Sequence, residues 1–166
     1  MNKVRTEDAA TYGAAVAHDE DEKIIRLAIR ILERQLAEVG VSDAAFTDPA
    51  AVKTFLRFNL ARLEHEEFAV LFLNNQHKLI KYQSMFRGTI DGASVYPREV
   101  AKEALTCNAA AVIFAHNHPS GISEPSQADR AITNKLKEAL SLFDIRVLDH
   151  FIVGETMYSF AEHGLI

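Results

Sequence analysis

The segment 109–129 constrains the fold of this chain more than any other part of the sequence. A continuous run of seven apolar residues ends in His116-Asn117-His118, and a loop rich in Pro, Gly and Ser leads on to Asp129 near the start of an expected helix. An apolar run of this length predicts a strand. Residues i and i+2 of an extended segment point the same way about 6.6 Å apart, so His116 and His118 are expected to face a common point.

The two histidines and the acid form a candidate metal site. A carboxylate from Asp129 completes three nitrogen and oxygen ligands, and three such ligands with a fourth position left for water are typical of catalytic zinc. Structural zinc is usually enclosed by four ligands, which commonly include cysteine. We therefore expect one zinc ion (Zn2+) per chain, held by His116, His118 and Asp129.

A second interpretation explains Asp129 without a metal. The sequence from Ser126 to Asp129 has the pattern of a helix capping box, in which Ser126 caps the helix and Asp129 lies near its positive end. A single histidine at a strand end is also commonly no more than a polar residue at a boundary. Both interpretations of Asp129 can hold together, so the prediction of a metal site depends mainly on the paired histidines.

The composition excludes several classes of protein. The chain has 166 residues, 48% of them hydrophobic and 25% charged, which fits one globular domain. A net charge of −5 and a pI of about 5.8 give no basic field to attract DNA or an anionic membrane, so DNA binding is expected to be weak or absent. One cysteine, Cys107, excludes an intrachain disulfide and a zinc ribbon. Since no signal peptide, lipidation motif or long apolar run is visible, we expect a cytoplasmic protein without a membrane anchor.

The first 64 residues divide into a leader and two helices. Residues 1–22 carry six acids against two bases and are expected to form a flexible acidic leader. Apolar residues at helical spacing predict a helix from Lys23 to Val39, and Asp48 followed by Pro49 predicts the start of a second helix. We expect the helices of residues 23–64 to pack on the core, and we assign them no chemistry.

Residues 65–166 alternate strands and helices and are expected to form the main domain. The first two strands make a hairpin, since a turn at 74–77 separates them. The order of elements predicts an α/β fold with a mixed twisted β-sheet flanked by helices. The paired histidines then lie at the C-terminal end of a strand, the usual edge for a ligand site in such sheets. The predicted strands are 68–73, 78–86, 109–115, 146–153 and 157–160, and the predicted helices are 97–108 and 126–143.

Several of these segments resemble a known family. The pair His116-x-His118, ten further residues and then Asp129, with Ser126 three positions before the acid, resembles the JAMM motif of JAB/MPN metalloproteases. More closely, residues 64–163 resemble the RadC family of bacterial JAB-domain proteins. Asn117 departs from the broader JAMM pattern, where Ser or Thr often stands between the histidines, and agrees with the RadC version. The segments that carry the resemblance are Glu67-Phe68 with Leu71-Phe72-Leu73, Phe86-Arg87-Gly88-Thr89, Pro97-Arg98-Glu99, His116 to Gly121, Pro125-Ser126 and Asp149-His150.

The resemblance implies the three-layer JAB/MPN architecture, which is like that of cytidine deaminases, and a role for each site residue. It implies His116, His118 and Asp129 as zinc ligands, Glu67 as the acid/base and Ser126 as a stabiliser of the tetrahedral intermediate. Full-length RadC-like proteins carry a helix-hairpin-helix region before the JAB domain. Residues 1–63 show no Gly-x-Gly hairpin, so the chain resembles the short RadC-like form, which weakens the family's traditional DNA-repair label here.

Three neighbouring acids compete for the acid/base role. A carboxylate beside a metal-activated water would take its proton and pass it to the leaving amine. Glu64, Glu66 and Glu67 all precede the first strand closely enough. We prefer Glu67 because it begins the buried strand, whereas Glu64 and Glu66 are expected to be solvated.

Arg87, Asp149 and His150 are candidates for groups that orient the ligands through hydrogen bonds. Salt bridges at strand ends are the commoner explanation for such residues. Both interpretations stay open at the level of the sequence.

The predicted function is that of a zinc-dependent hydrolase of the JAMM type, a metalloprotease that cleaves a peptide or isopeptide-type amide bond in a protein or peptide substrate. A DNA repair-associated or DNA-processing metal-dependent protein is the first alternative, and the acidic charge disfavours it. An inactive JAB interaction scaffold is the second, and the complete ligand set disfavours it. An iron oxygenase with two histidines and one carboxylate shares the ligand types, but those folds are commonly all-β.

Overall fold

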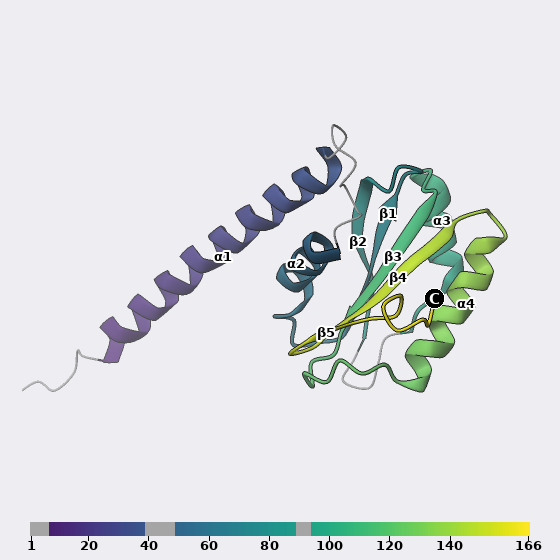
Figure 1. Cartoon of the computed structure of the whole chain (residues 1–166). Helices are drawn as coiled ribbons and strands as arrows, with labels where there is room; N and C mark the ends of the chain where they lie inside the picture. The colour runs from purple at the N-terminus through teal and green to yellow at the C-terminus, as the bar shows by residue number, and fades with distance from the viewer. Residues whose placement is uncertain (1–6, 39–48, 89–93) are drawn as a thin grey trace, which may run out of the picture.

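The structure is a computed structural model and describes residues 7–38, 49–88 and 94–166 (Figure 1). Five strands form one sheet in the order β2-β1-β3-β4-β5. Because β3 and β4 run parallel while the other neighbouring pairs run antiparallel, the sheet is mixed, as predicted. The strands are β1 (Glu67–Leu73), β2 (Leu79–Arg87), β3 (Ala111–Asn117), β4 (Arg146–Val153) and β5 (Met157–Ser159), and the helices are α1 (Glu7–Glu38), α2 (Pro49–Leu60), α3 (Pro97–Thr106) and α4 (Gln127–Ser141).

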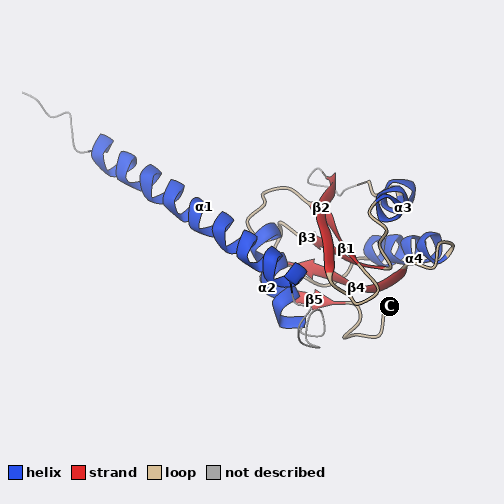
Figure 2. Cartoon of the chain, turned by 90° about the horizontal axis from the view of Figure 1, so that it is seen from above, coloured by secondary structure: helices blue, strands red, loops and turns tan. Residues whose placement is uncertain are grey.

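Helices cover both faces of the sheet (Figure 2). Helix α2 packs on one face, and α3 and α4 pack on the other, which confirms the predicted α/β fold. In β1, Leu71 and Leu73 join the core beneath α2, whereas Val70 and Phe72 join the core beneath α3 and α4. A strand that is covered on both faces needs apolar residues at consecutive positions, which explains its unbroken apolar sequence.

The same alternation sets the direction of each residue at the end of β3. Ile113 and Ala115 belong to the core beneath α2, whereas Val112 and Phe114 belong to the core beneath α3 and α4. His116 follows Phe114 on the α4 side because side chains alternate along a strand. The sheet therefore directs the first histidine toward the start of α4.

Helix α1 begins at Glu7, so the predicted start at Lys23 is wrong. Residues 7–22, expected to be a flexible leader, continue the helix, whereas residues 1–6 lie outside the described part of the chain. Alanine is frequent in this stretch, and the helix carries ion pairs at i,i+4 spacing. Both features favour a helix.

The apolar stripe of α1 divides between the core and the surface. Ile29 and Leu32 pack against the core beneath α2, whereas Ile24 is 64% exposed and Leu27 is 58% exposed. The N-terminal part of the helix projects beyond the sheet (Figure 1). None of the helices in the described ranges is long and apolar enough to cross a membrane.

The remaining predicted elements are present with small shifts at their ends. Helix α4 has Ser126 as its N-cap, as the capping pattern predicts. Helix α2 begins at Pro49, as predicted, but Asp48, which was expected to precede it as its start signal, lies outside the described residues.

The packing of α2 generates a prediction for stability. Phe55 is fully buried, and its ring meets Tyr82 edge-on with the centroids 5.1 Å apart. Because a large cavity would remain, Phe55→Ala is expected to lower the free energy of unfolding by about 3–5 kcal/mol. Phe58→Ala, at a position of the same helix that is 40% exposed, should lower it by less than about 1 kcal/mol. Urea denaturation measures both, and equally small effects would contradict the place of α2 in the core.

Candidate metal site

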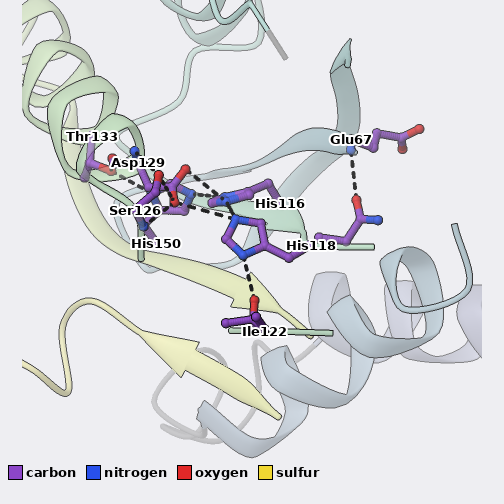
Figure 3. Close-up of polar contacts among 9 residues, drawn as sticks. Glu67, His116, His118, Ile122, Ser126, Asp129, Thr133 and His150 are labelled. Carbon is purple, nitrogen blue, oxygen red and sulfur yellow. Dashed lines mark hydrogen bonds and ion pairs between the residues drawn. The ribbon is translucent and has the colours of Figure 1, made fainter. Parts of the chain in front are cut away.

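Three side chains meet at the C-terminal end of β3 (Figure 3). His116 belongs to the strand, His118 to the loop that follows it, and Asp129 to the first turn of α4. Their ligand atoms all lie within 4.8 Å of one another. The structure thus brings together the three residues that the sequence predicts as ligands.

The spacing of the donor atoms fits a small tetrahedral ion. His116 Nε2 lies 2.9 Å from His118 Nε2 and 3.2 Å from Asp129 Oδ1, and His118 Nε2 lies 3.6 Å from Asp129 Oδ2. Ligands about 2.0–2.2 Å from a zinc ion at tetrahedral angles are about 3.3–3.6 Å apart. The two imidazoles and the carboxylate can therefore hold one metal ion after small adjustments.

The loop that carries His118 also orients its ring. His118 Nδ1 donates to the main-chain carbonyl of Ile122 at 2.7 Å (Figure 3), which leaves the lone pair of a neutral ring on Nε2. The loop is closed by main-chain bonds from His118 N to Val153 O and from Gly121 N to His118 O. A Cβ at Gly154 would lie 2.3 Å from Gly121 O, so only glycine permits this close approach.

His116 is held from behind by a second imidazole. It is 1% exposed, and its Nδ1 lies 2.8 Å from Nε2 of His150, which is fully buried. Thr133 of α4 completes the contact, with its Oγ1 at 2.7 Å from His150 Nδ1. Burial lowers the pKa of His150 well below its usual range, so its ring is neutral.

Asp129 is both a helix cap and a candidate ligand. Its Oδ2 accepts hydrogen bonds from Ser126 N at 2.7 Å and Ser126 Oγ at 2.6 Å, and its own N–H donates to Ser126 Oγ at 3.1 Å. Burial by itself raises the pKa of Asp129, but hydrogen bonds from His116, His118 and Ser126 outweigh this effect and hold the pKa well below its usual range. The carboxylate is therefore ionised, as a metal ligand must be.

The donors open onto a pocket of about 390 Å³. Ser126, Ala128 and Ile132 from the start of α4 line this pocket together with Phe68 and Val95. A site with one open side leaves room for a water molecule and for a group of a substrate. This shape distinguishes it from an enclosed structural metal site.

Glu67 does not reach the cluster, which corrects its predicted place beside the metal. Its carboxylate points away from the three donors (Figure 3) and lies 3.3 Å from His65 Nε2. Burial and the negative charge of Glu67 raise the pKa of Tyr82, whose ring packs on the α2 side of the sheet. Because Phe68 faces the pocket, its neighbour Glu67 has to face the opposite side.

Glu66 lines the pocket instead, although the sequence suggested that it is solvated. It is half-buried. The hydrogen bond that His118 donates to Asp129 raises the pKa of His118, and the charge of Glu66 raises it further. The side chain of Asn117 fixes this segment, since its Oδ1 accepts from Glu67 N at 2.8 Å and its Nδ2 donates to His65 O at 2.9 Å. This role of Asn117 was missed from the sequence, where only its place between the histidines singled it out.

Of the three residues that the sequence suggested as orienting groups, only one contacts a candidate ligand. His150 contacts His116, as described above, whereas Asp149 points toward β5 and accepts hydrogen bonds from Ser159 Oγ and Ala161 N at 2.6 and 2.9 Å. Burial raises the pKa of Asp149, and its role is to fasten the C-terminal segment to β4. Arg87 is exposed at the end of β2, paired in register with Glu67.

Comparisons with known proteins agree with the motifs of the site. The family model of the RadC-like JAB domain matches residues 46–165. The chain is 58% identical over 144 residues to a UPF0758 protein of Vibrio cholerae serotype O1, with 87% of this chain and 89% of that protein covered. It is 55% identical over 148 residues to the UPF0758 protein YkfG of Escherichia coli K12, with 89% and 92% covered. It is 56% identical over 148 residues to a UPF0758 protein of Leptothrix cholodnii, of which it spans 65%. The chain therefore belongs to the RadC-like JAB domain family.

Proposed function

We propose that this protein is a zinc-dependent hydrolase of the JAMM type, which cleaves a peptide or isopeptide-type amide bond with an activated water. The observation that carries this proposal is the convergence of two imidazoles and one carboxylate on an open pocket. Three protein ligands with a fourth position left free are the arrangement of catalytic zinc sites, and nitrogen and oxygen donors suit this metal.

A zinc ion in this site would lower the pKa of a bound water to about 7 and polarise the amide carbonyl. The protein has to hold the donors in place and to move a proton. Asp129 is fixed by Ser126, His118 by Ile122 and His116 by His150, so the three donors are positioned before any metal binds. Such preorganisation lowers the cost of assembling the site during the reaction.

We assign the acid/base role to Glu66 in place of Glu67. Glu66 borders the pocket that contains His116, His118 and Asp129, whereas the Glu67 carboxylate faces the other side of the sheet. A carboxylate at the pocket wall can accept a proton from the attacking water and return it to the leaving amine. The anchoring of this segment by Asn117 keeps Glu66 at the wall.

Ser126 has two tasks in this proposal. In the resting state its hydroxyl donates to Asp129 Oδ2, which orients the carboxylate toward the histidines. Because Ser126 lines the pocket, rotation of the same hydroxyl would let it donate to the negative charge that develops on the carbonyl oxygen. One hydroxyl proton cannot serve both acceptors at once, so the two tasks belong to different stages of the reaction.

The first prediction concerns metal content. Wild-type protein is expected to bind about one zinc ion per chain, and His116→Ala combined with His118→Ala should remove it because two of three donors are lost. Elemental analysis by mass spectrometry measures the content. His77→Ala combined with His163→Ala, two histidines outside the cluster, serves as the control and should keep the metal. Stoichiometric zinc in the first double variant would end the proposal.

The second prediction concerns the acid/base. Glutamine has nearly the shape of glutamate but cannot take a proton at neutral pH, so Glu66→Gln should reduce hydrolysis by about 10²–10⁴-fold. Glu67→Gln and Glu64→Gln should stay within a few-fold of wild type, and all three variants should keep their zinc. A library of peptide substrates identifies a cleavable sequence, and the initial rates of the four proteins are then compared.

Two outcomes of this comparison would count against the proposal. A larger loss in Glu67→Gln than in Glu66→Gln would refute the new assignment. If neither wild type nor Glu66→Gln cleaves any substrate, and both bind a protein partner equally well, an interaction scaffold becomes the better account.

A further inference from the structure

Behind the three donors lies a chain of hydrogen bonds that the proposed reaction does not use. It runs from the main-chain carbonyl of Asp129 through Thr133 Oγ1 and the His150 ring to His116 Nδ1 (Figure 3). The three contacts measure 2.5, 2.7 and 2.8 Å in that order. The other nitrogen of the His116 ring, Nε2, lies 3.2 Å from Asp129 Oδ1. The chain therefore links the main chain of Asp129 to a neighbour of its own carboxylate.

The direction of every hydrogen bond in this chain follows from its first member. A carbonyl oxygen only accepts, so the single hydroxyl proton of Thr133 points to Asp129 O. Thr133 Oγ1 must then accept from His150 Nδ1, which puts the proton of the neutral His150 ring on Nδ1. The bare His150 Nε2 in turn accepts from His116 Nδ1.

We propose that Thr133 and His150 are positioning residues that select the metal-binding tautomer of His116. With its proton on Nδ1, a neutral His116 ring presents a lone pair on Nε2, the nitrogen that faces His118 and Asp129. In the opposite arrangement, His150 would donate from Nε2 to His116 Nδ1, and the proton of His116 would occupy Nε2 and block the ligand position. The hydroxyl of Thr133 decides between the two arrangements, although His150 and His116 separate it from the proposed metal position.

The surroundings of His150 make this selection effective. The ring is fully buried, and the aromatic rings of Phe68, Phe114 and Phe160 contact it with centroids 5.5, 5.8 and 4.8 Å away. No water is needed to satisfy its two nitrogens, because Thr133 and His116 already do so. An apolar cage of this kind strengthens the hydrogen bonds that remain and penalises any unpaired nitrogen. The His118 tautomer, in contrast, is set by a main-chain carbonyl and is independent of this chain.

The proposal rests on the metal site proposed above, but its test needs no substrate. The protonation of each ring nitrogen is read from long-range proton–nitrogen correlation spectra of the full-length, metal-free protein at about pH 8. The zinc dissociation constant is measured by competition with a chromogenic chelator. In wild type, His150 is expected to carry its proton on Nδ1, and His116 is expected to carry a proton on Nδ1, the nitrogen that faces His150.

Thr133→Val keeps the shape of the side chain but removes the hydroxyl. His116 is expected to populate the Nε2–H tautomer in this variant, and zinc affinity should fall by about 10–100-fold, the usual effect of losing a group that orients a ligand. Thr133→Ser keeps the hydroxyl and should behave like wild type. Thr106→Val is the matched control, since Thr106 Oγ1 also bonds a carbonyl one turn back in its helix but lies in α3, outside the site.

Three results would overturn the proposal: a wild-type protein in which His150 carries its proton on Nε2 and His116 Nδ1 is bare, a Thr133→Val variant with wild-type tautomers and affinity, or a Thr133→Ser variant as weak as Thr133→Val. The wild-type spectrum decides the matter even if Thr133→Val does not fold. Tight zinc binding with the expected tautomers but no hydrolysis would count against the proposed enzyme alone, and leave this inference in place.

Discussion

The burial of β3 on both faces is the constraint on which the rest of the structure depends. Because helices cover both sides of the strand, consecutive side chains alternate between two separate cores, and the alternation continues past the last apolar residue. His116 consequently emerges on the side of α4, next to Asp129, while Asn117 emerges on the other side and anchors the segment before β1. One strand thus supplies a candidate ligand and the group that positions the proposed acid/base.

The start of α4 is the second element that the site depends on. A helix N-terminus needs acceptors for its free N–H groups, and the capping box of Ser126 and Asp129 provides them. The same contacts fix the Asp129 carboxylate and, together with the hydrogen bonds from His116 and His118, keep it ionised, so a local requirement of helix formation also prepares a candidate ligand. Thr133, one turn further along α4, extends this preparation to His150. The start of α4 therefore both places one donor and supports a second through His150.

Much of this arrangement could be predicted from the sequence, and the failures have physical reasons. The spacing of His116 and His118 identifies two donors, and the capping pattern places Asp129 at a helix start. The sequence did not show which of Glu66 and Glu67 faces the pocket, because a strand with apolar residues on both faces gives no signal of which residue points which way, and a shift of one residue exchanges the faces. The start of α1 was missed because acidic, alanine-rich residues are compatible both with a solvated leader and with an exposed helix. The contact between His116 and His150 joins positions 34 residues apart, and only the pairing of β3 with β4 brings them together.

A crystal structure of the zinc-loaded protein, with anomalous data collected on both sides of the zinc absorption edge, tests the central claim most directly. The account predicts one zinc ion bonded to His116 Nε2, His118 Nε2 and a carboxylate oxygen of Asp129 at about 2.0–2.2 Å, with a solvent molecule as the fourth ligand in hydrogen-bond reach of Glu66. A zinc ion enclosed by four protein ligands, or one bound away from these residues, would contradict it.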